Sequence, residues 1–557
     1  MSSPPNFEIS SAKSTAATLA IKGLLVSLFI VYLILRLIAW QQTALVEDHD
    51  SLVYLDQIKI FRTFDLEKII SMRGFTTQFY SFTASLLNWP GWSVETSARL
   101  SSLLFSSLLF VSLLGMGKEI AGIKEAAFGL ILLTFSPVFI PFSFSILAEP
   151  TYVALIYTGL WLFWTQYNNP KTWKAGLLGF IFGLAFLTRI EGFANLFVIP
   201  FLQGVLIFFG QPKENNFRRY VGWTTIFMLS FSLLAGAHIW RVSHKFGYFA
   251  IDERQVWTLI LQAPDGRSYD EKLGGLDYSP SQVNLDYVRA HPEVQARFAS
   301  NMSIKQTVKG YVKTVLVNLA DLYQNKLNLL IGPLGLLFFC VGLYALFRSK
   351  HPRDGFLVLA FLTFNLVGPL LYQVQIRYIA VIFPLMMLVA GIGIVHLAGS
   401  VAALWKRTSA TENALCVVFL FALLAAWIRP LYGFYSAPRT INGEYSPESL
   451  REPARIIKEI KEKELLRPPI LSARKGYLTY HAEAEPAALP YTNMEGLIKF
   501  CTLNKVDFIF LEYGHIGKHP FLAVFAAGKP LQEFALLYRG TDAFGRKLEL
   551  YRFQKTP

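Results

Sequence analysis

Charged residues are scarce in this chain of 557 residues. Asp, Glu, Lys and Arg make up 16% of it, hydrophobic residues make up 53%, and the mean hydropathy is +0.39. A soluble globular domain usually carries about a quarter charged residues. The low charge therefore excludes a wholly soluble protein. It predicts a polytopic membrane protein with room left for one soluble domain.

Cysteine is also rare. Cys340 and Cys416 lie in apolar segments, and Cys501 stands alone in the polar C-terminal part. This pattern excludes a disulfide framework and a CxxC metal signature. The N-terminal stretch MSSPPNFEISSAKSTAATLAIKG has no small-residue cleavage site after a short apolar core. We therefore expect the first apolar run to be a retained helix and not a signal peptide.

Long apolar runs dominate what is present. A membrane-spanning helix needs roughly 20 largely apolar residues, and about eleven runs meet that criterion. They lie near 20–40, 98–117, 126–146, 151–167, 173–188, 192–210, 221–244, 327–347, 355–372, 379–399 and 413–432.

Positive charge is unevenly distributed between the loops that join these runs. The net charge of +14 predicts basic cytoplasmic loops and contact with anionic lipids, and no nucleic acid partner. With a cytoplasmic N-terminus, every short inside loop is basic, whereas the short outside turns contain only Arg189 and Arg377. We therefore expect a transmembrane domain over 1–433, with outer loops 41–97 and 245–326. A soluble extracytoplasmic α/β domain follows over 434–557.

Both outer loops contain a predicted amphipathic surface helix. The first has Leu52, Leu55, Ile58, Phe61 and Ile69 at near-helical spacing. The second spans 301–326, and its lysines repeat at every fourth residue beside an apolar face, where they would meet lipid phosphates. After residue 433 we predict a helix over 446–466 that is capped by Ser446. We also predict strands within 468–481, 506–514, 533–540 and 548–553, and a helix over 491–504.

Acidic residues follow the first apolar run directly, in the stretch LVEDHDSLVYLDQ (45–57). Ionisable residues at membrane depth are costly and tend to be functional. The predicted sidedness brings acids and arginines of several sequence regions to the outer face, where a carboxylate could accept a proton and arginines could bind a phosphate. The candidates are Glu47, Asp48, His49, Asp50, Arg73, Gln78, Tyr80, Arg99, Glu149, Arg189, Glu191 and Arg377.

Simpler interpretations stand beside this one. The acids at 47–50 could be solvated loop residues. Glu149 precedes Pro150 and could be a helix-start residue that the helix dipole stabilises. Arg189 and Arg377 could extend to lipid headgroups. His49 between Asp48 and Asp50 leaves a metal site open, although the outer turns show no second His-rich partner.

The order of these motifs resembles a known family. The acidic stretch is followed by ARL (98–100), LAEP (147–150), LTRIEG (187–192) and RY (377–378). This order is similar to that of the GT-C superfamily of polyprenol-phosphate-dependent glycosyltransferases. The branch is the bacterial one related to protein O-mannosyltransferases and to the lipid A aminoarabinose transferase. The resemblance covers the whole chain. It implies a polytopic α-helical membrane protein with about 11 transmembrane helices of GT-C type, amphipathic surface helices and a small C-terminal α/β outer domain.

The resemblance also implies residue roles. Asp48 and Asp50 match the family's acidic motif, although His49 separates the two acids, so that either aspartate could be the general base. Tyr54 matches the motif's tyrosine. Substrate binding would involve the motif residues Tyr54, Glu149, Arg189, Glu191, Arg377 and Tyr378. The predicted sidedness adds Glu47, His49, Arg73 and Tyr80 to these substrate-binding candidates.

The implied reaction is transfer of a sugar from a polyprenyl-phosphate donor to a hydroxyl of a lipid, glycan or protein acceptor. It would occur with inversion on the outer face of the inner (plasma) membrane. No organic cofactor is implied. Whether Asp48, His49 and Asp50 hold a divalent cation is left open. Two alternatives are a transporter or flippase for lipid-linked saccharides, whose usual inverted halves are not visible in the sequence, and an oligosaccharide ligase.

Overall fold

The computed structural model describes the chain in segments. They are residues 8–42, 49–71, 78–87, 89–166, 171–209, 216–246, 249, 251, 304–349, 352–371, 374–405, 408–436, 447–465, 467–473, 476–490, 492–514, 521–527, 531–542 and 544–554. The chain forms two compact units, each made of separate stretches of sequence. Unit 1 is Met1–Gln42, Arg99–Ala235 and Asn318–Ser436, and unit 2 is Thr43–Ala98, Gly236–Val317 and Ala437–Pro557. The division at residue 433 stays a prediction.

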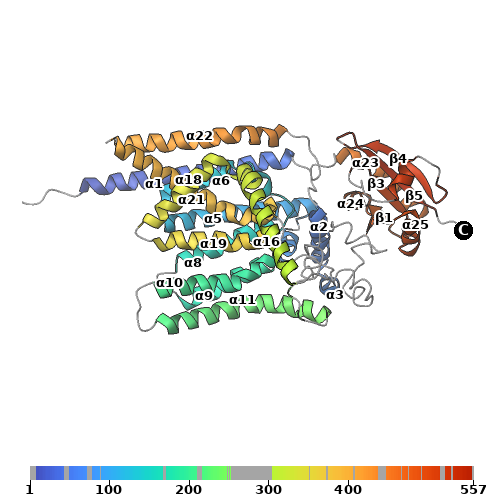
Figure 1. The fold of residues 1–557 in the computed structure, drawn as a ribbon, viewed down its shortest axis with the longest axis horizontal. Coiled ribbons are helices and arrows are strands. Elements are labelled where there is room, and N and C mark those ends of the chain that lie inside the picture. The colour runs from blue at the N-terminus through green and yellow to red at the C-terminus, as the bar shows by residue number, and fades with distance from the viewer. Residues whose placement is uncertain are drawn as a thin grey trace, which may run out of the picture. The chain divides into compact units, whose positions relative to one another are not determined.

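Unit 1 is a bundle of apolar helices (Figure 1). Six helices of the described residues are long and apolar enough to cross a membrane, or up to seven if one bent pair counts as a single span. Ten of the eleven predicted apolar runs lie mainly on helices. The run 126–146 is divided, because α6 ends at Phe135, α7 covers only Phe139–Phe142 and 143–146 are not helical. The number of membrane spans stays a prediction. The helices that make up most of the unit are α1 (Glu8–Gln42), α5 (Val94–Ile120), α6 (Ile123–Phe135), α7 (Phe139–Phe142), α8 (Glu149–Trp164), α9 (Thr172–Phe186), η1 (Ile190–Ala194), α10 (Asn195–Phe209), α11 (Asn216–Phe246), η2 (Leu322–Leu327), α17 (Asn328–Leu330), α18 (Gly332–Arg348), α19 (Pro352–Leu371), α20 (Ile376–Ile379), η3 (Ala380–Ile382), α21 (Phe383–Leu404) and α22 (Ser409–Ser436).

Helix α21 is the centre of the bundle. It packs against α6, α18 and α22. The apolar span Ile376–Leu404, which α21 completes, is 89% buried, against 22% for the span Gly23–Gln41 of α1. Small residues allow this close approach, as is usual between membrane helices. A Cβ atom at Gly391 would overlap the backbone of α6 at Gly129, and one at Gly393 would overlap the carbonyl of Phe338 in α18.

Arg36 ties α1 to the end of α6. Its guanidinium is fully buried and donates to the carbonyl oxygens of Leu133 at 3.2 Å and Thr134 at 3.0 Å. Carbonyls in the last turn of a helix have no partner within the helix, and a cation there also opposes the helix dipole. The one arginine of this first apolar run therefore has a structural role, which was not predicted from the sequence.

Unit 2 contains the short helices of the first outer loop. Its elements there are α2 (His49–Arg62), α3 (Leu66–Ser71), α4 (Phe79–Leu86) and, in the second loop, most of α16 (Ile304–Asp321). The predicted apolar face is confirmed for α2, because Leu55 and Ile58 are fully buried and Leu52 and Phe61 nearly so. Its extension to Ile69 in the same helix is wrong, since α2 ends at Arg62 and Ile69 lies in α3. The predicted helix in the second loop is confirmed as α16. That either helix lies on a membrane surface stays a prediction.

The C-terminal part of unit 2 is a sheet domain. Strands β1 (Ile470–Ala473), β2 (Glu485–Ala488), β3 (Phe508–Glu512), β4 (Phe534–Thr541) and β5 (Lys547–Phe553) form one sheet in the order β2-β1-β3-β5-β4. Strand β1 pairs in parallel with β2 and β3, and β5 pairs antiparallel with β3 and β4. The helices are α23 (Pro447–Glu464), α24 (Tyr477–Ala482), α25 (Met494–Leu503) and α26 (Leu522–Ala526).

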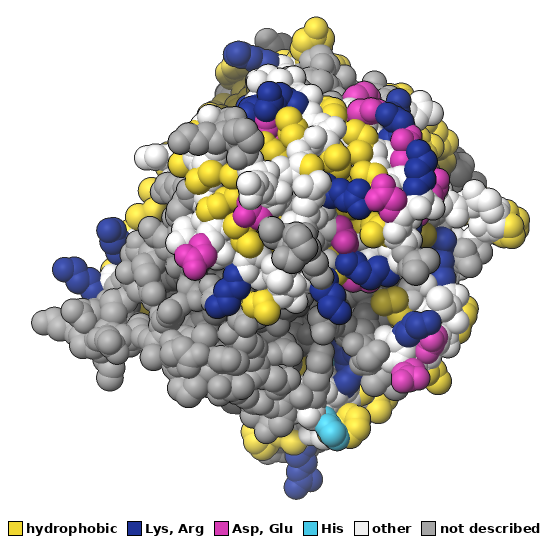
Figure 2. All heavy atoms as spheres, turned by 90° about the vertical axis from the view of Figure 1, so that its right-hand side faces the viewer, with side chains coloured by type: hydrophobic (Ala, Val, Ile, Leu, Met, Phe, Trp, Pro, Cys, Tyr) yellow, Lys and Arg dark blue, Asp and Glu magenta, His cyan; other side chains and the backbone are white. Residues whose placement is uncertain are grey.

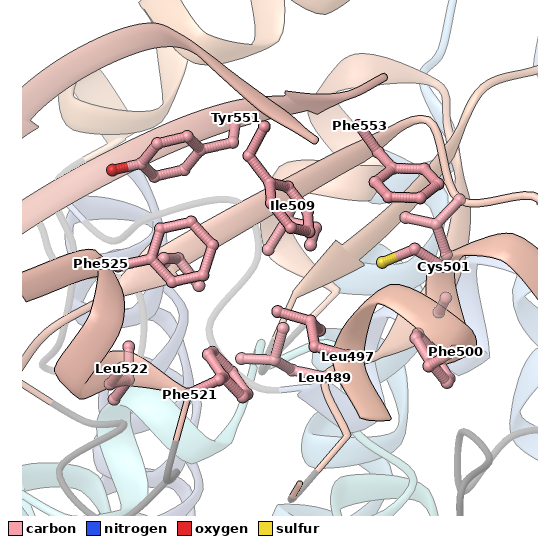
Figure 3. Close-up of a cluster of buried hydrophobic side chains, with 14 residues drawn as sticks. Leu489, Leu497, Phe500, Cys501, Ile509, Phe521, Leu522, Phe525, Tyr551 and Phe553 are labelled. Atoms are coloured by element: carbon pink, nitrogen blue, oxygen red, sulfur yellow. The ribbon is translucent and has the colours of Figure 1, made fainter. Parts of the chain in front are cut away.

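The core of the sheet domain lies between the sheet and α25 and α26. Leu497 of α25 and Phe525 of α26 point toward Ile509 and Tyr551 of the sheet (Figure 3), and Phe500 of α25 belongs to the same buried cluster. On the face in Figure 2, Lys and Arg side chains stand beside Asp and Glu side chains. Exposed ion pairs contribute little, about 0–1 kcal/mol each, so the apolar core contributes more to the stability of this domain than the ion pairs on its surface.

One predicted strand is wrong in its second half. Strand β1 covers the start of 468–481, but residues Tyr477–Ala482 form helix α24. The β-forming residues of YLTYH favour a strand locally, and burial of Tyr477, Leu478 and Ala482 in a helix overrides that preference. Strand β2 and helix α26 were not predicted. The predicted cap Ser446 lies outside the described residues.

Candidate active site

Glu149 is the first residue of α8 and precedes Pro150 in the first turn. This position puts its carboxylate at the positive end of the helix dipole, as the helix-start interpretation predicted. The residue is 2% exposed. A buried carboxylate needs a cation or several hydrogen-bond donors, because burial of a lone charge is very costly.

Arg189 supplies that cation. It follows α9 and precedes η1, and its NH1 donates to Oε1 of Glu149. Its Nε and NH2 donate to the two carboxylate oxygens of Glu191 at 3.1 and 2.7 Å, in the fork geometry that suits a guanidinium. The side chain of Glu149 is 3% exposed, that of Arg189 is 10% exposed and that of Glu191 is 47% exposed. The Glu149–Arg189 pair is therefore shielded from solvent, whereas Glu191 faces outward.

A second arginine shares a tyrosine ring with Arg189. The guanidinium carbon of Arg189 lies 5.5 Å from the ring centroid of Tyr378, and that of Arg377 lies 5.0 Å from it. Arg377 donates from Nε to Oε1 of Gln375 at 2.8 Å and from NH2 to the hydroxyl of Tyr378 at 3.2 Å. Both distances to the ring fall within the range of a cation–π contact.

The chain thus brings together residues from the LAEP, LTRIEG and RY motifs within unit 1. We call them the Glu149 cluster: Glu149, Arg189, Glu191, Arg377 and Tyr378. The cluster holds carboxylates and guanidiniums in equal number. These five of the predicted site residues therefore lie side by side, as the predicted sidedness of the turns requires.

One oxygen of this cluster has no donor. Oε2 of Glu149 is buried and makes no hydrogen bond to the described residues. A buried acceptor without a partner costs about 1–3 kcal/mol. A hydroxyl group of a bound substrate would remove that cost.

The predicted acidic motif is described only in part. Asp50 lies in the first turn of α2 and is half-buried. Glu47, Asp48 and Arg73 lie outside the described residues, and of His49 only the backbone is described. Within the described residues, no group of His, Cys, Asp or Glu could hold a metal ion. The metal site at 48–50 therefore stays a prediction.

Tyr54 and Tyr80 are buried packing residues of unit 2. Their rings meet edge to face with centroids 5.2 Å apart, which joins α2 to α4. The hydroxyl of Tyr80 donates to the carbonyl oxygen of Ala98 at 3.1 Å. A role of either tyrosine in substrate binding stays a prediction.

Two residues near the Glu149 cluster were not predicted from the sequence. Gln375 orients Arg377. Tyr152 interacts electrostatically with Arg189 and Glu191. Tyr152 is three residues after Glu149, so helical spacing could have placed it on the same face.

Comparisons with known proteins agree with this architecture. The model of the dolichyl-phosphate-mannose-protein mannosyltransferase family matches residues 80–240, which include Glu149, Arg189 and Glu191. No curated protein sequence matches the chain.

Solved structures are similar over most of the chain. The archaeal oligosaccharyltransferase AglB from Archaeoglobus fulgidus, in complex with an inhibitory peptide and a dolichol-phosphate, has a TM-score of 0.58 at 12% identity, and the match covers 96% of this chain and 74% of that one. ArnT from Cupriavidus metallidurans bound to undecaprenyl phosphate has a TM-score of 0.53 at 12% identity, covering 96% and 98%. The arabinofuranosyltransferase AftD from Mycobacteria has a TM-score of 0.51 at 11% identity, covering 95% and 41%. At such identities the likeness concerns the fold alone.

Proposed function

Since the chain has the fold of the GT-C membrane glycosyltransferases, we propose that it transfers a sugar from a polyprenyl-phosphate donor to a hydroxyl acceptor. The observation that carries the proposal is the Glu149 cluster, in which Arg189 and Arg377 meet at the ring of Tyr378. The AglB and ArnT structures of similar fold contain dolichol-phosphate and undecaprenyl phosphate. That both bound lipids are polyprenyl phosphates supports the same class of donor for this chain.

The arginines are assigned to the donor phosphate. A guanidinium binds phosphate in fork geometry and stays charged at any accessible pH. Glu149 and Glu191 hold Arg189, and Gln375 orients Arg377, so little side-chain freedom would be lost when a phosphate binds. As the bond between sugar and phosphate breaks, the electron pair leaves with the phosphate, and the arginines would offset the growing negative charge.

The acids of the first loop are assigned to the acceptor. A sugar phosphate already has a good leaving group, so the difficult step is activation of the acceptor hydroxyl. A carboxylate would accept the hydroxyl proton while the new C–O bond forms, from the face opposite the phosphate, which inverts the anomeric carbon. We assign this role to Asp48, the first acid of the motif, with Asp50 as its partner. A divalent cation bound by the same acids is the alternative that chelation would reveal.

The reaction is assigned to the outer face of the inner membrane. The basic short loops support a cytoplasmic N-terminus, which puts the LAEP, LTRIEG and RY turns outside. The lipid donor stays in the bilayer, so the reacting groups must lie at its surface.

The fold likeness to AglB makes an oligosaccharide ligase the second candidate. The two candidates differ in the donor that they use, a monophosphate-linked single sugar or a lipid-linked oligosaccharide. A flippase would move either lipid intact and release no lipid phosphate.

One experiment separates these functions. The purified full chain is incubated with lipid, glycan and peptide acceptors that carry hydroxyl groups. The donors are a panel of hexosyl and pentosyl polyprenyl monophosphates and a lipid-diphosphate oligosaccharide, and the released lipid is measured by mass spectrometry. Release from a monophosphate donor is expected. Release only from the oligosaccharide donor would favour the ligase, and no release from any donor would contradict the transferase.

Arg377→Ala in the same assay tests the phosphate assignment. Removal of one preorganised donor to the transition-state charge costs about 3 kcal/mol, or roughly a hundredfold in rate. Arg348→Ala is the matched control, because Arg348 ends α18 and contacts Tyr344 of the same helix. Full activity of Arg377→Ala would contradict the phosphate assignment and favour the interpretation that Arg377 extends to lipid headgroups.

A further inference from the structure

Helix α24 of the sheet domain contacts the helix that begins at the acidic motif. The Nζ atom of Lys59, on α2, lies 4.9 Å from the ring centroid of Tyr480. The hydroxyl of Tyr480 donates a hydrogen bond to Oε1 of Glu95, in the first turn of α5. All three residues belong to unit 2. The sheet domain therefore contacts the loop 41–97, which precedes it by several hundred residues in the sequence.

Glu95 connects this contact to the end of α2. Burial lowers the pKa of Arg62, the last residue of α2, and of His481 of α24, and the Glu95 carboxylate acts against this effect at both residues. Arg62 donates from NH2 to Oγ of Ser97 at 2.5 Å. The last turns of α2 are thus held from two sides, by the start of α5 and by α24. We call Lys59, Arg62, Glu95 and Tyr480 the α2 clamp.

Two residues of the α2 clamp, Lys59 and Arg62, lie on the same helix as Asp50. Nine residues separate Lys59 from Asp50, which is about 14 Å along the axis at about 1.5 Å per residue. Helix α2 has 14 residues. Isolated helices shorter than about 12–15 residues are marginal in water, so its order and direction depend on tertiary contacts. Contacts at the C-terminal end of α2 therefore contribute to the direction of its N-terminal end.

A second contact surface runs between the two ends. Gln57 accepts a hydrogen bond from Oγ of Ser81, on α4, at 2.7 Å, and Tyr54 packs on Tyr80. These contacts hold the middle of α2, whereas the clamp holds its C-terminal end. Loss of the clamp would therefore tilt the N-terminal turn of α2, where Asp50 lies.

We propose that Tyr480 is a positioning residue: through it the sheet domain holds α2 and fixes the direction of Asp50. The inference rests on the proposed function, in which Asp50 takes part in acceptor activation. Tyr480 acts on the reaction through α2 and not by contact with substrate. The sheet domain accordingly contributes to the reaction by orienting α2.

Hydrogen–deuterium exchange of the full chain tests the first half of the proposal. Tyr480→Phe removes the hydroxyl and keeps the ring over Lys59, and Tyr480→Ala removes both. Amides of α2 are expected to exchange about tenfold faster in Tyr480→Phe, because a hydrogen bond to a charged group is worth at least about the 1.4 kcal/mol that corresponds to tenfold. The effect should be larger in Tyr480→Ala. Strands β1 and β3 should keep their exchange rates, which shows that the domain stays folded.

Tyr538→Phe is the matched control, since it removes a tyrosine hydroxyl from β4 of the same domain. It should leave α2 unchanged. Unchanged exchange of α2 in both Tyr480 variants would overturn the proposal.

Kinetics test the second half. Tyr480→Phe should lower kcat about tenfold, within the roughly hundredfold that a displacement of about 1 Å can cost. The KM for the donor should not change, because the residues assigned to the phosphate are not altered, whereas general loss of structure would change both. Faster exchange of α2 with an unchanged kcat would overturn the positioning role. If the wild-type chain releases no lipid from any donor, the proposed function fails, and the exchange data still decide whether Tyr480 holds α2.

Discussion

The buried pair of Glu149 and Arg189 allows the most detailed prediction. Glu149→Gln and Arg189→Met each remove one charge of a pair whose side chains are 3% and 10% exposed. Removal of one partner of a buried pair typically costs about 3–5 kcal/mol, because the other charge stays buried. Arg189→Met should lie at the upper end, since Glu149 then has no cation. Glu149→Gln should cost less, because Arg189 keeps Glu191, whose side chain is 47% exposed.

The double variant separates stability from function. Glu149→Gln with Arg189→Met contains no buried charge at these two positions, and replacement of a whole buried pair is often close to neutral. We expect the double variant to be about 2 kcal/mol more stable than the sum of the single effects, within the range of couplings between contacting residues. Thermal and urea unfolding of the purified protein in detergent measures this coupling. Transfer activity should stay lost, because the donor phosphate has lost Arg189.

A matched control comes from an ion pair at another position of unit 1. Lys124 and Glu412 lie 2.6 Å apart, but their side chains are 36% and 31% exposed. Glu412→Gln should therefore cost less than about 1 kcal/mol. A double variant whose destabilisation equals the sum of the two single effects would refute the buried pair. A double variant that recovers both stability and transfer would show that the pair is scaffold only.

Two further predictions concern pH and topology. Burial lowers the pKa of His481 below its ordinary 6.5, with Glu95 opposing and Lys458 adding to the effect. The unfolded state then binds a proton at higher pH than the folded state, so the free energy of unfolding of the sheet domain falls as the pH drops below about 6.5. Urea unfolding, followed by hydroxyl-radical labelling of buried Phe500, should show this dependence of the free energy of unfolding on pH. His481→Gln should reduce the dependence, and an unchanged dependence in the variant would show that His481 is not its cause. Cysteine introduced at Ser446 should be labelled only from the outer side and at Asn215 only from the cytoplasm, and reversal of either result would contradict the topology.

Local sequence determined much of the helical framework. Apolar length is a property of a short segment, so the predicted membrane runs fall on helices such as α5, α11 and α22. The apolar face of α2 was predictable for the same reason, because its spacing is local. Sheet-domain elements with strong patterns, such as β3 and α25, were also predicted. The error at α24 arose where tertiary packing opposed the local preference for a strand.

The site was predictable only as a set of residues. Sidedness placed Glu149, Arg189 and Arg377 on one face, but the fork between Arg189 and Glu191 depends on the turn into η1. The contact of both guanidiniums with the ring of Tyr378 depends on how α20 packs in the bundle. The contact of Tyr480 with Glu95 joins residues 385 positions apart, and no local pattern announces it.

The most direct test of the central claim is the rate of sugar transfer from a polyprenyl-phosphate donor by purified Asp48→Asn and Asp50→Asn. Each exchange keeps the shape of the side chain and removes the base. One variant should lose transfer by a factor of about 10² to 10⁴, the usual contribution of a general base, and the other should weaken it less. Asp321→Asn, on half-exposed α16 surface, is the control and should transfer at the wild-type rate.

The same measurement with a chelator identifies the role of the acids. If an aspartate is the general base, the chelator leaves the wild-type rate unchanged and the aspartate variants stay folded. Loss of activity with the chelator alone would make the acids metal ligands and Glu149 the first candidate for the base. Full activity of both Asp48→Asn and Asp50→Asn would contradict general-base catalysis by this motif, because the acidic stretch would then be only a solvated loop.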